Sequence, residues 1–109
     1  MAFDERLAQR IRKVLSDRSG VAERMMFGGI AFMVRGNMCC GVVKSDLMVR
    51  VGPQQYETAL AMPGARPMDF TGRAMKGMVY VDSASCANGR ALAKWVNGGA
   101  DFAASLPKK

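Results

Sequence analysis

The sequence predicts a two-layer α+β fold in which helices cover one face of an antiparallel sheet, in the order α-β-β-β-α-β-β-α. Three observations lead to this prediction. Segments with helical apolar spacing open and close the chain, alternating segments lie between them, and residues typical of tight turns separate neighbouring alternating segments. Strands joined by tight turns pair antiparallel, and the apolar stripes of the helices need a sheet face to cover.

The first helix is predicted from Phe3 to Arg18. Acidic Asp4 and Glu5 fall in its first turn, where they complement the helix dipole, and Gly20 follows as a stop signal. Apolar residues recur three or four positions apart on one stripe, namely Phe3, Leu7, Ile11, Val14 and Leu15.

Between Arg24 and Val51 the apolar residues alternate, which is typical of half-buried strands. Gly36 and Asn37 both tolerate positive φ, so they predict a tight hairpin turn, and residues 44–46 predict a second short turn. The three strands of this antiparallel meander are expected at residues 30–34, 38–43 and 47–51.

The second half of the chain predicts two helices and two strands. Pro53 is acceptable in a first helical turn and precedes a short helix around Tyr56 and Leu60. The last helix begins at Asn88, and its apolar phase continues across Gly98-Gly99, so we expect one weakened or kinked helix rather than two. The strands are expected at residues 68–70 and 78–81.

Composition limits the classes of function. At 109 residues, half of them apolar, the chain is expected to form one domain over residues 1–109. It has no long apolar run and no signal-peptide pattern, so we expect a cytoplasmic protein with no membrane partner. The net charge of +7 favours acidic partners such as nucleic acid. The absence of histidine excludes Ser-His and Cys-His nucleophile systems and His-ligated metals.

Cys39 and Cys40 are the residues most suggestive of chemistry. Consecutive residues of a regular strand point to opposite faces, so the two sulfurs cannot both bind one metal. We expect one on a core face and the other on a helix-facing or interface surface, and Cys86 is distant in the sequence. We therefore predict no catalytic residue, no cofactor and no metal site, and keep a thiol-based activity at Cys39 or Cys40 only as a third hypothesis.

Ten methionines, clustered mainly in residues 25–48 and 62–78, allow two interpretations. Methionine fills irregular cores, and it also forms adaptable docking surfaces because its side chain is flexible and polarizable. Filling of the core is the favoured interpretation for most of them. Met25, Met26 and Phe27, beside the double glycine, are the predicted protein-interaction residues.

Basic residues on the first helix predict a second kind of site. Arg6, Arg10 and Lys13 share one stripe beside the apolar face, and such a stripe can follow phosphates. The alternative is an ordinary solvated helix face, on which Asp4, Glu5 and Asp17 reduce the net positive charge. The same two interpretations apply to a second basic cluster, formed by Arg66, Arg73 and Lys76.

The whole chain resembles the TfoX/Sxy N-terminal-domain family. The segments that carry the resemblance, in order, are Met26-Phe27-Gly28-Gly29-Ile30-Ala31-Phe32-Met33-Val34, Gly36-Asn37-Met38, Asp46-Leu47-Met48-Val49-Arg50-Val51-Gly52, Arg66-Pro67-Met68-Asp69-Phe70, Met75-Lys76-Gly77-Met78-Val79-Tyr80-Val81, Trp95-Val96 and Ala104-Ser105-Leu106-Pro107. The specificity of the resemblance lies in the order and spacing of these segments together.

The resemblance implies a bacterial regulator rather than an enzyme. The family's founding members regulate natural competence and DNA transformation, and help the cyclic-AMP receptor protein activate promoters. They carry a second, helical domain after this one, and we expect the present chain to correspond to the N-terminal domain alone. The resemblance further implies a secretion-chaperone-like α+β fold, a homodimer, and no catalytic residues. We therefore expect a regulatory or adaptor domain whose partner is a protein of the transcription machinery, with weakly specific nucleic-acid binding as the alternative.

Overall fold

The computed structural model describes residues 3–26, 28–68 and 76–108. Within them, six strands form one sheet in the order β1-β2-β3-β4-β6-β5, and every neighbouring pair is antiparallel. The elements are α1 (Glu5–Leu15), β1 (Val21–Met26), β2 (Gly29–Val34), β3 (Asn37–Val43), β4 (Asp46–Arg50), α2 (Tyr56–Leu60), β5 (Ala65–Pro67), β6 (Met78–Val81) and α3 (Gly89–Ser105).

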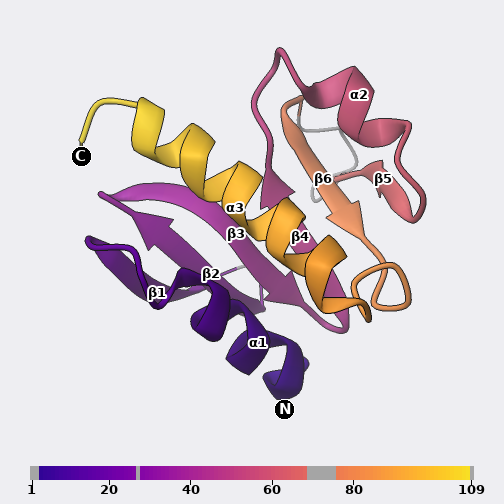
Figure 1. Cartoon of the computed structure of the whole chain (residues 1–109), viewed down its shortest axis with the longest axis horizontal. Coiled ribbons are helices and arrows are strands. Elements are labelled where there is room, and N and C mark those ends of the chain that lie inside the picture. The colour runs from indigo at the N-terminus through magenta and orange to yellow at the C-terminus, as the bar shows by residue number, and fades with distance from the viewer. Residues whose placement is uncertain (1–2, 27, 69–75, 109) are drawn as a thin grey trace.

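The helices cover one face of this sheet (Figure 1). The long helix α3 crosses β2, β3 and β4, α1 packs beside it, and α2 lies over β5 and β6. The core fills the space between the layers, with Phe32, Leu47 and Val49 of the sheet meeting Ile11 of α1 and Val96 of α3. The predicted two-layer α+β fold is confirmed.

The opposite face of the sheet carries a second cluster that is rich in methionine. Met48, Met68 and Met78 are buried in it, and half-buried side chains pack around them, namely Met26, Met33, Met38, Val43 and Tyr80. Most of the methionines therefore fill a core. The exceptions among the described residues are Met25, which is 68% exposed, and Met62, which is 37% exposed.

The strand β1 was not expected from the sequence. It pairs along its whole length with β2, from Val21 opposite Val34 to Met26 opposite Gly29, and forms one edge of the sheet. Four of its six side chains are exposed, so the apolar alternation that marks the other strands is absent. The predicted order is otherwise retained, with β1 added before the three-stranded meander.

The turn between β2 and β3 lies one residue earlier than Gly36-Asn37. Arg35 and Gly36 both have positive φ, at 54° and 83°, as a tight primed hairpin turn requires. Asn37 is the first residue of β3 and is 2% exposed, with its side-chain amide donating to the carbonyl oxygen of Pro107 at 2.9 Å. This residue therefore ties the sheet to the chain beyond α3.

A β-bulge follows in β3. Phe32 pairs with Cys40 and Met33 with Met38, so Cys39 is an extra residue without a partner in the ladder. A bulge places two consecutive side chains on nearly the same side of the sheet. Cys39 and Cys40 accordingly both lie in the core under the helices, and the expectation that they occupy different surfaces is wrong.

The remaining elements follow the predictions with shifted boundaries. β6 has the predicted bounds, and α3 is one helix across Gly98-Gly99. Its N-cap is Asn88, whose side chain accepts from the backbone amides of Arg90 and Ala91. The other late strand, β5, lies at Ala65–Pro67 instead of residues 68–70. Met68 follows it in irregular structure, and residues 69 and 70 lie outside the described residues.

Candidate functional site

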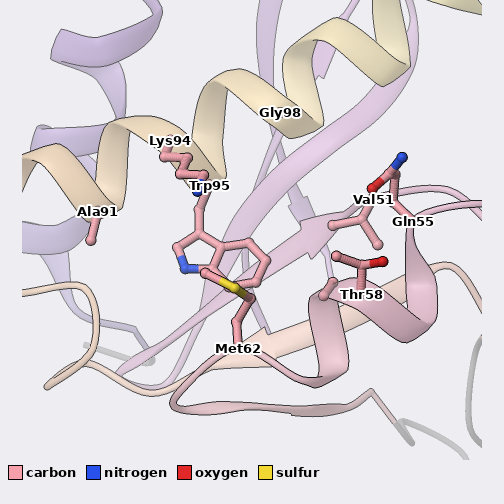
Figure 2. Close-up of a pocket in the computed structure, with 9 residues that line it drawn as sticks. Val51, Gln55, Thr58, Met62, Ala91, Lys94, Trp95 and Gly98 are labelled. Carbon is pink, nitrogen blue, oxygen red and sulfur yellow. The ribbon is translucent and has the colours of Figure 1, made fainter.

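An apolar groove of about 250 Å³ separates α2 from α3 on the helix-covered side of the sheet. Its lining residues come from α3, from α2 and the residues that flank it, and from the residue after β4. They are Val51, Gln55, Thr58, Ala59, Met62, Ala91, Lys94, Trp95 and Gly98. Trp95 of α3 and Met62, just after α2, point toward one another across it (Figure 2). Sequence reasoning did not find this groove.

Each wall of the groove is the face of a helix. On α3 the lining positions are 91, 94, 95 and 98, and on the segment around α2 they are 55, 58, 59 and 62. Both sets follow the i, i+3, i+4, i+7 spacing of one helical face. The cap residues Gln55 and Ala61 have right-handed helical φ and ψ, which continues the face beyond the five residues of α2. Two helical faces therefore border a space that neither fills.

The groove is open at Gly98. A Cβ built at Gly98 meets nothing within 4 Å, whereas one built at Gly99 would stand 2.7 Å from the carbonyl oxygen of Cys39. Close packing of the helix on the sheet therefore requires glycine at position 99. At position 98 glycine leaves space, and a mid-helix glycine costs about 1 kcal/mol relative to alanine.

Lys94 is the one charged residue among the described residues that line the groove. Its side chain is exposed, and no carboxylate within the described ranges pairs with it. The other lining side chains are apolar or carry a neutral amide or hydroxyl group. The groove thus offers an apolar surface with a cation beside it.

Of the predicted protein-interaction residues, the structure describes two. Met25 lies on the edge strand β1 and is the most exposed large apolar side chain described. Met26, the next residue, packs against the methionine cluster on the opposite sheet face. Phe27 lies outside the described residues. Met25 and Met26 therefore do not form one continuous surface.

The basic stripe Arg6, Arg10 and Lys13 lies along the exposed side of α1. Arg6 and Lys13 are exposed, and Arg10 donates from Nη2 to the carbonyl oxygen of Ala87 at 3.1 Å. None of the three forms an ion pair with a described carboxylate. Three other arginines do form such pairs, in Arg12–Glu23, Arg18–Asp101 and Arg66–Asp46.

The second basic cluster is not supported as a unit. Arg66 pairs with Asp46 and lies over the ring of Tyr80, 5.1 Å from its centroid. Lys76 is exposed, and Arg73 lies outside the described residues.

All three cysteines are buried and free. The thiol of Cys39 donates to the carbonyl oxygen of Val96, with 3.8 Å between Sγ and oxygen. A hydrogen bond with Cys39, together with burial, raises the pKa of Cys40, and burial raises the pKa of Cys86 to about 11. The thiols of Cys40 and Cys86 therefore stay protonated near neutral pH and are poor nucleophiles.

The described residues contain neither a cluster that could hold a metal ion nor a helix that could cross a membrane. No group of three or more Cys, Asp or Glu residues is placed to hold a metal ion within residues 3–26, 28–68 and 76–108. Over the same ranges, every helix is too short or too polar to cross a membrane.

The chain matches a known protein family. The model of the family described as "TfoX N-terminal domain" matches residues 13–103 of the 109-residue chain. The matched region runs from α1 to near the end of α3 and includes both walls of the groove. No curated protein and no solved structure matched the chain.

Proposed function

Because the chain belongs to the TfoX N-terminal domain family, we propose that it is a non-enzymatic regulatory or adaptor domain that acts by protein–protein contact with the transcription machinery. The observation that carries this proposal is the family match over residues 13–103, since the family is one of competence regulators. The exposed apolar side chains of Met25, Met62 and the groove are consistent with a domain that works through contact.

The first contact residues that we propose are Met25, Met26 and Phe27, with Met25 and Met26 reaching a partner from the two faces of the edge strand. The 68% exposure of Met25 supports it, because a large apolar side chain on an edge strand is available to a partner. Met26 would contribute through the rim of the methionine cluster on the other sheet face.

The test uses purified RNA polymerase and purified cyclic-AMP receptor protein, each passed over the immobilised chain with and without promoter DNA. We expect saturable binding that weakens about tenfold in a Met25→Ser, Met26→Ser variant. Ala22→Ser is the matched control, because Ala22 is exposed on the same strand. Absence of binding to either protein contradicts the proposed function, and unchanged binding by the double variant contradicts this surface alone.

A second candidate function is weakly specific nucleic-acid binding through Arg6, Arg10 and Lys13. The observation that favours it is that these three side chains lack carboxylate partners within the described ranges, whereas Arg12, Arg18 and Arg66 have them. Cations that form no ion pair within the chain are available to phosphates, although Arg10 also donates to the carbonyl oxygen of Ala87.

Fluorescence anisotropy on random duplex DNA at several salt concentrations tests this candidate. A log–log salt slope of roughly −0.9 per neutralised phosphate is expected if the stripe binds the backbone. Changing Arg6, Arg10 and Lys13 to glutamate should abolish binding, while the equal charge change at Arg24, Lys44 and Lys108 should leave most of it. A flat salt response, or equal losses in both triple variants, contradicts the stripe.

A further inference from the structure

We propose that the groove between α2 and α3 is the docking site for an amphipathic helix of a partner protein, with apolar residues on one face and acidic residues beside them. The inference rests on the proposed function in one respect, that the chain works through protein contact. It assigns the contact to a surface distinct from Met25 and commits to the chemistry of the partner.

The size of the groove favours side chains of a protein over a free small molecule. Small-molecule sites have volumes of about 300–1,000 Å³ and enclose most of their ligand. A groove of about 250 Å³ with an open mouth is instead suited to one or two large apolar anchors. The aromatic wall of Trp95 supplies the kind of contact that dominates such anchors.

The shape of the groove favours a helix. Its walls are two helical faces with the same seven-residue spacing, at 91–98 and 55–62, and seven residues of helix extend roughly 10 Å. Small side chains at Ala59, Ala91 and Gly98 allow another backbone to approach closely. A third helix that presents residues at i, i+3 or i+4, and i+7 can insert them between the two walls.

Gly98 supports the same conclusion independently. Its position has room for a side chain and ordinary helical φ, so neither packing nor backbone strain accounts for glycine there. Any larger residue would project into the groove and shorten it. The sequence thus retains an open groove despite the lower helix propensity of glycine.

The positive charge beside the groove favours an acidic partner. Lys94 borders the groove without a described carboxylate partner, and the chain carries a net charge of +7. A second copy of the chain carries the same +7, so charge disfavours it as the occupant of this groove. A helix with glutamate or aspartate beside its apolar face is attracted and oriented by Lys94.

The test selects a displayed library of 14-residue peptides on the intact chain, with counter-selection on Gly98→Leu. Enriched peptides should show apolar residues at helical spacing flanked by acidic residues. The best one is then synthesised without tryptophan, because Trp95 is the only tryptophan in the chain and its fluorescence reports occupancy of the groove. We expect Gly98→Leu to weaken binding about tenfold or more and Lys94→Glu roughly fivefold.

Lys108→Glu is the matched control for charge, since it makes the same change at an exposed residue that does not line the groove, and it should leave affinity unchanged. Replacing the acidic residues of the peptide by lysine should also abolish binding. If no peptide is enriched, or if enriched peptides are basic, lack helical spacing or bind Gly98→Leu equally well, the proposal is wrong.

The test needs no transcription protein, so its failure is distinct from failure of the RNA polymerase experiment. Thermal melting checks that the Gly98→Leu variant is folded. If this variant does not fold, the Lys94→Glu variant tests the groove instead.

Discussion

Gly99 of α3 lies directly against the backbone of Cys39, so that a Cβ at position 99 would stand 2.7 Å from the Cys39 carbonyl oxygen. The same Cβ would stand 3.2 Å from Cγ1 of Val49 on the neighbouring strand. Cys39 is the extra residue of the bulge in β3, and its backbone packs against α3 at Gly99. At this position the sheet-facing side of the helix has no side chain. Adjacent glycines in this helix have different physical roles.

Alanine at these two positions should therefore have opposite effects. Gly99→Ala should lower the free energy of unfolding by about 1–3 kcal/mol, because the helix must move away from the sheet. Gly98→Ala should raise it by up to about 1 kcal/mol, because the new methyl group meets open space and alanine has the higher helix propensity. Urea unfolding of both variants measures the difference, and a shift in the same direction for both would contradict this packing.

Asn37 should hold the C-terminal turn of α3 in place. Its amide Nδ2 donates to Pro107 at 2.9 Å and lies 3.5 Å from the carbonyl oxygen of Ala103. Asn37→Ala removes these donors from a buried site and should cost about 1–3 kcal/mol. Hydrogen exchange should accelerate in the last turn of α3 and not in α1. Ser105→Ala, which removes only an exposed local hydrogen bond to Phe102, serves as the comparison, and equal effects of the two would sink the idea.

The ion pair between Arg12 and Glu23 should add a small, pH-dependent contribution to stability. The hydrogen bond with Arg12 lowers the pKa of Glu23 below its ordinary 4.5. A lowered pKa in the folded state stabilises the protein above that range, and the stabilisation is lost as the pH falls through the folded-state value. Glu23→Gln should thus cost about 0.2–1 kcal/mol at pH 7 and nothing at a pH well below 4.5. A difference that persists in acid would mean that the ion pair is not its source.

The three thiols should be inert in the folded protein. Burial raises the pKa of Cys86 to about 11, and the pKa of Cys40 is also raised, so these two cysteines have a small thiolate fraction at pH 8, and Cys39 is buried away from reagents. Labelling by a maleimide should be slow without denaturant and involve all three in urea. Because a raised thiol pKa stabilises the fold only while the thiol stays protonated, stability should fall as the pH rises from about 9 toward 11. Fast labelling of one cysteine in the native state would contradict this prediction and support the hypothesis of a thiol-based activity.

The sequence was sufficient for the elements whose periodicity is strong. The helical stripe of α1 and the alternation in β2, β3 and β4 each arise from burial on one face, so the pattern is visible without a structure. β1 was missed because an edge strand with four exposed side chains needs no apolar alternation. Its pairing with β2 depends on the turn at Gly28, which has a φ of 73°.

The site was less accessible to sequence reasoning. The bulge at Cys39 changes which way a single residue points, and nothing in the local pattern indicates it. The groove depends on the distance that separates α2 from α3, and this distance is set by tertiary packing. The one local signal was Gly98, a mid-helix glycine on the same face as Ala91 and Trp95. Its role can be distinguished from that of Gly99 only when the surroundings of both glycines are known.

The edge strand β1 also bears on how copies of this chain can associate. Two identical strands related by a two-fold axis pair antiparallel with one residue opposite itself. The two registers that engage nearly all of Val21–Met26 centre on Glu23 or on Arg24, and so set like charges against each other. At the other edge, Pro67 of β5 lacks an N–H to donate. A homodimer of the kind that the family resemblance implies should therefore form through a face of the domain and not through a sheet edge, so that the described six-stranded sheet is not extended across the subunits.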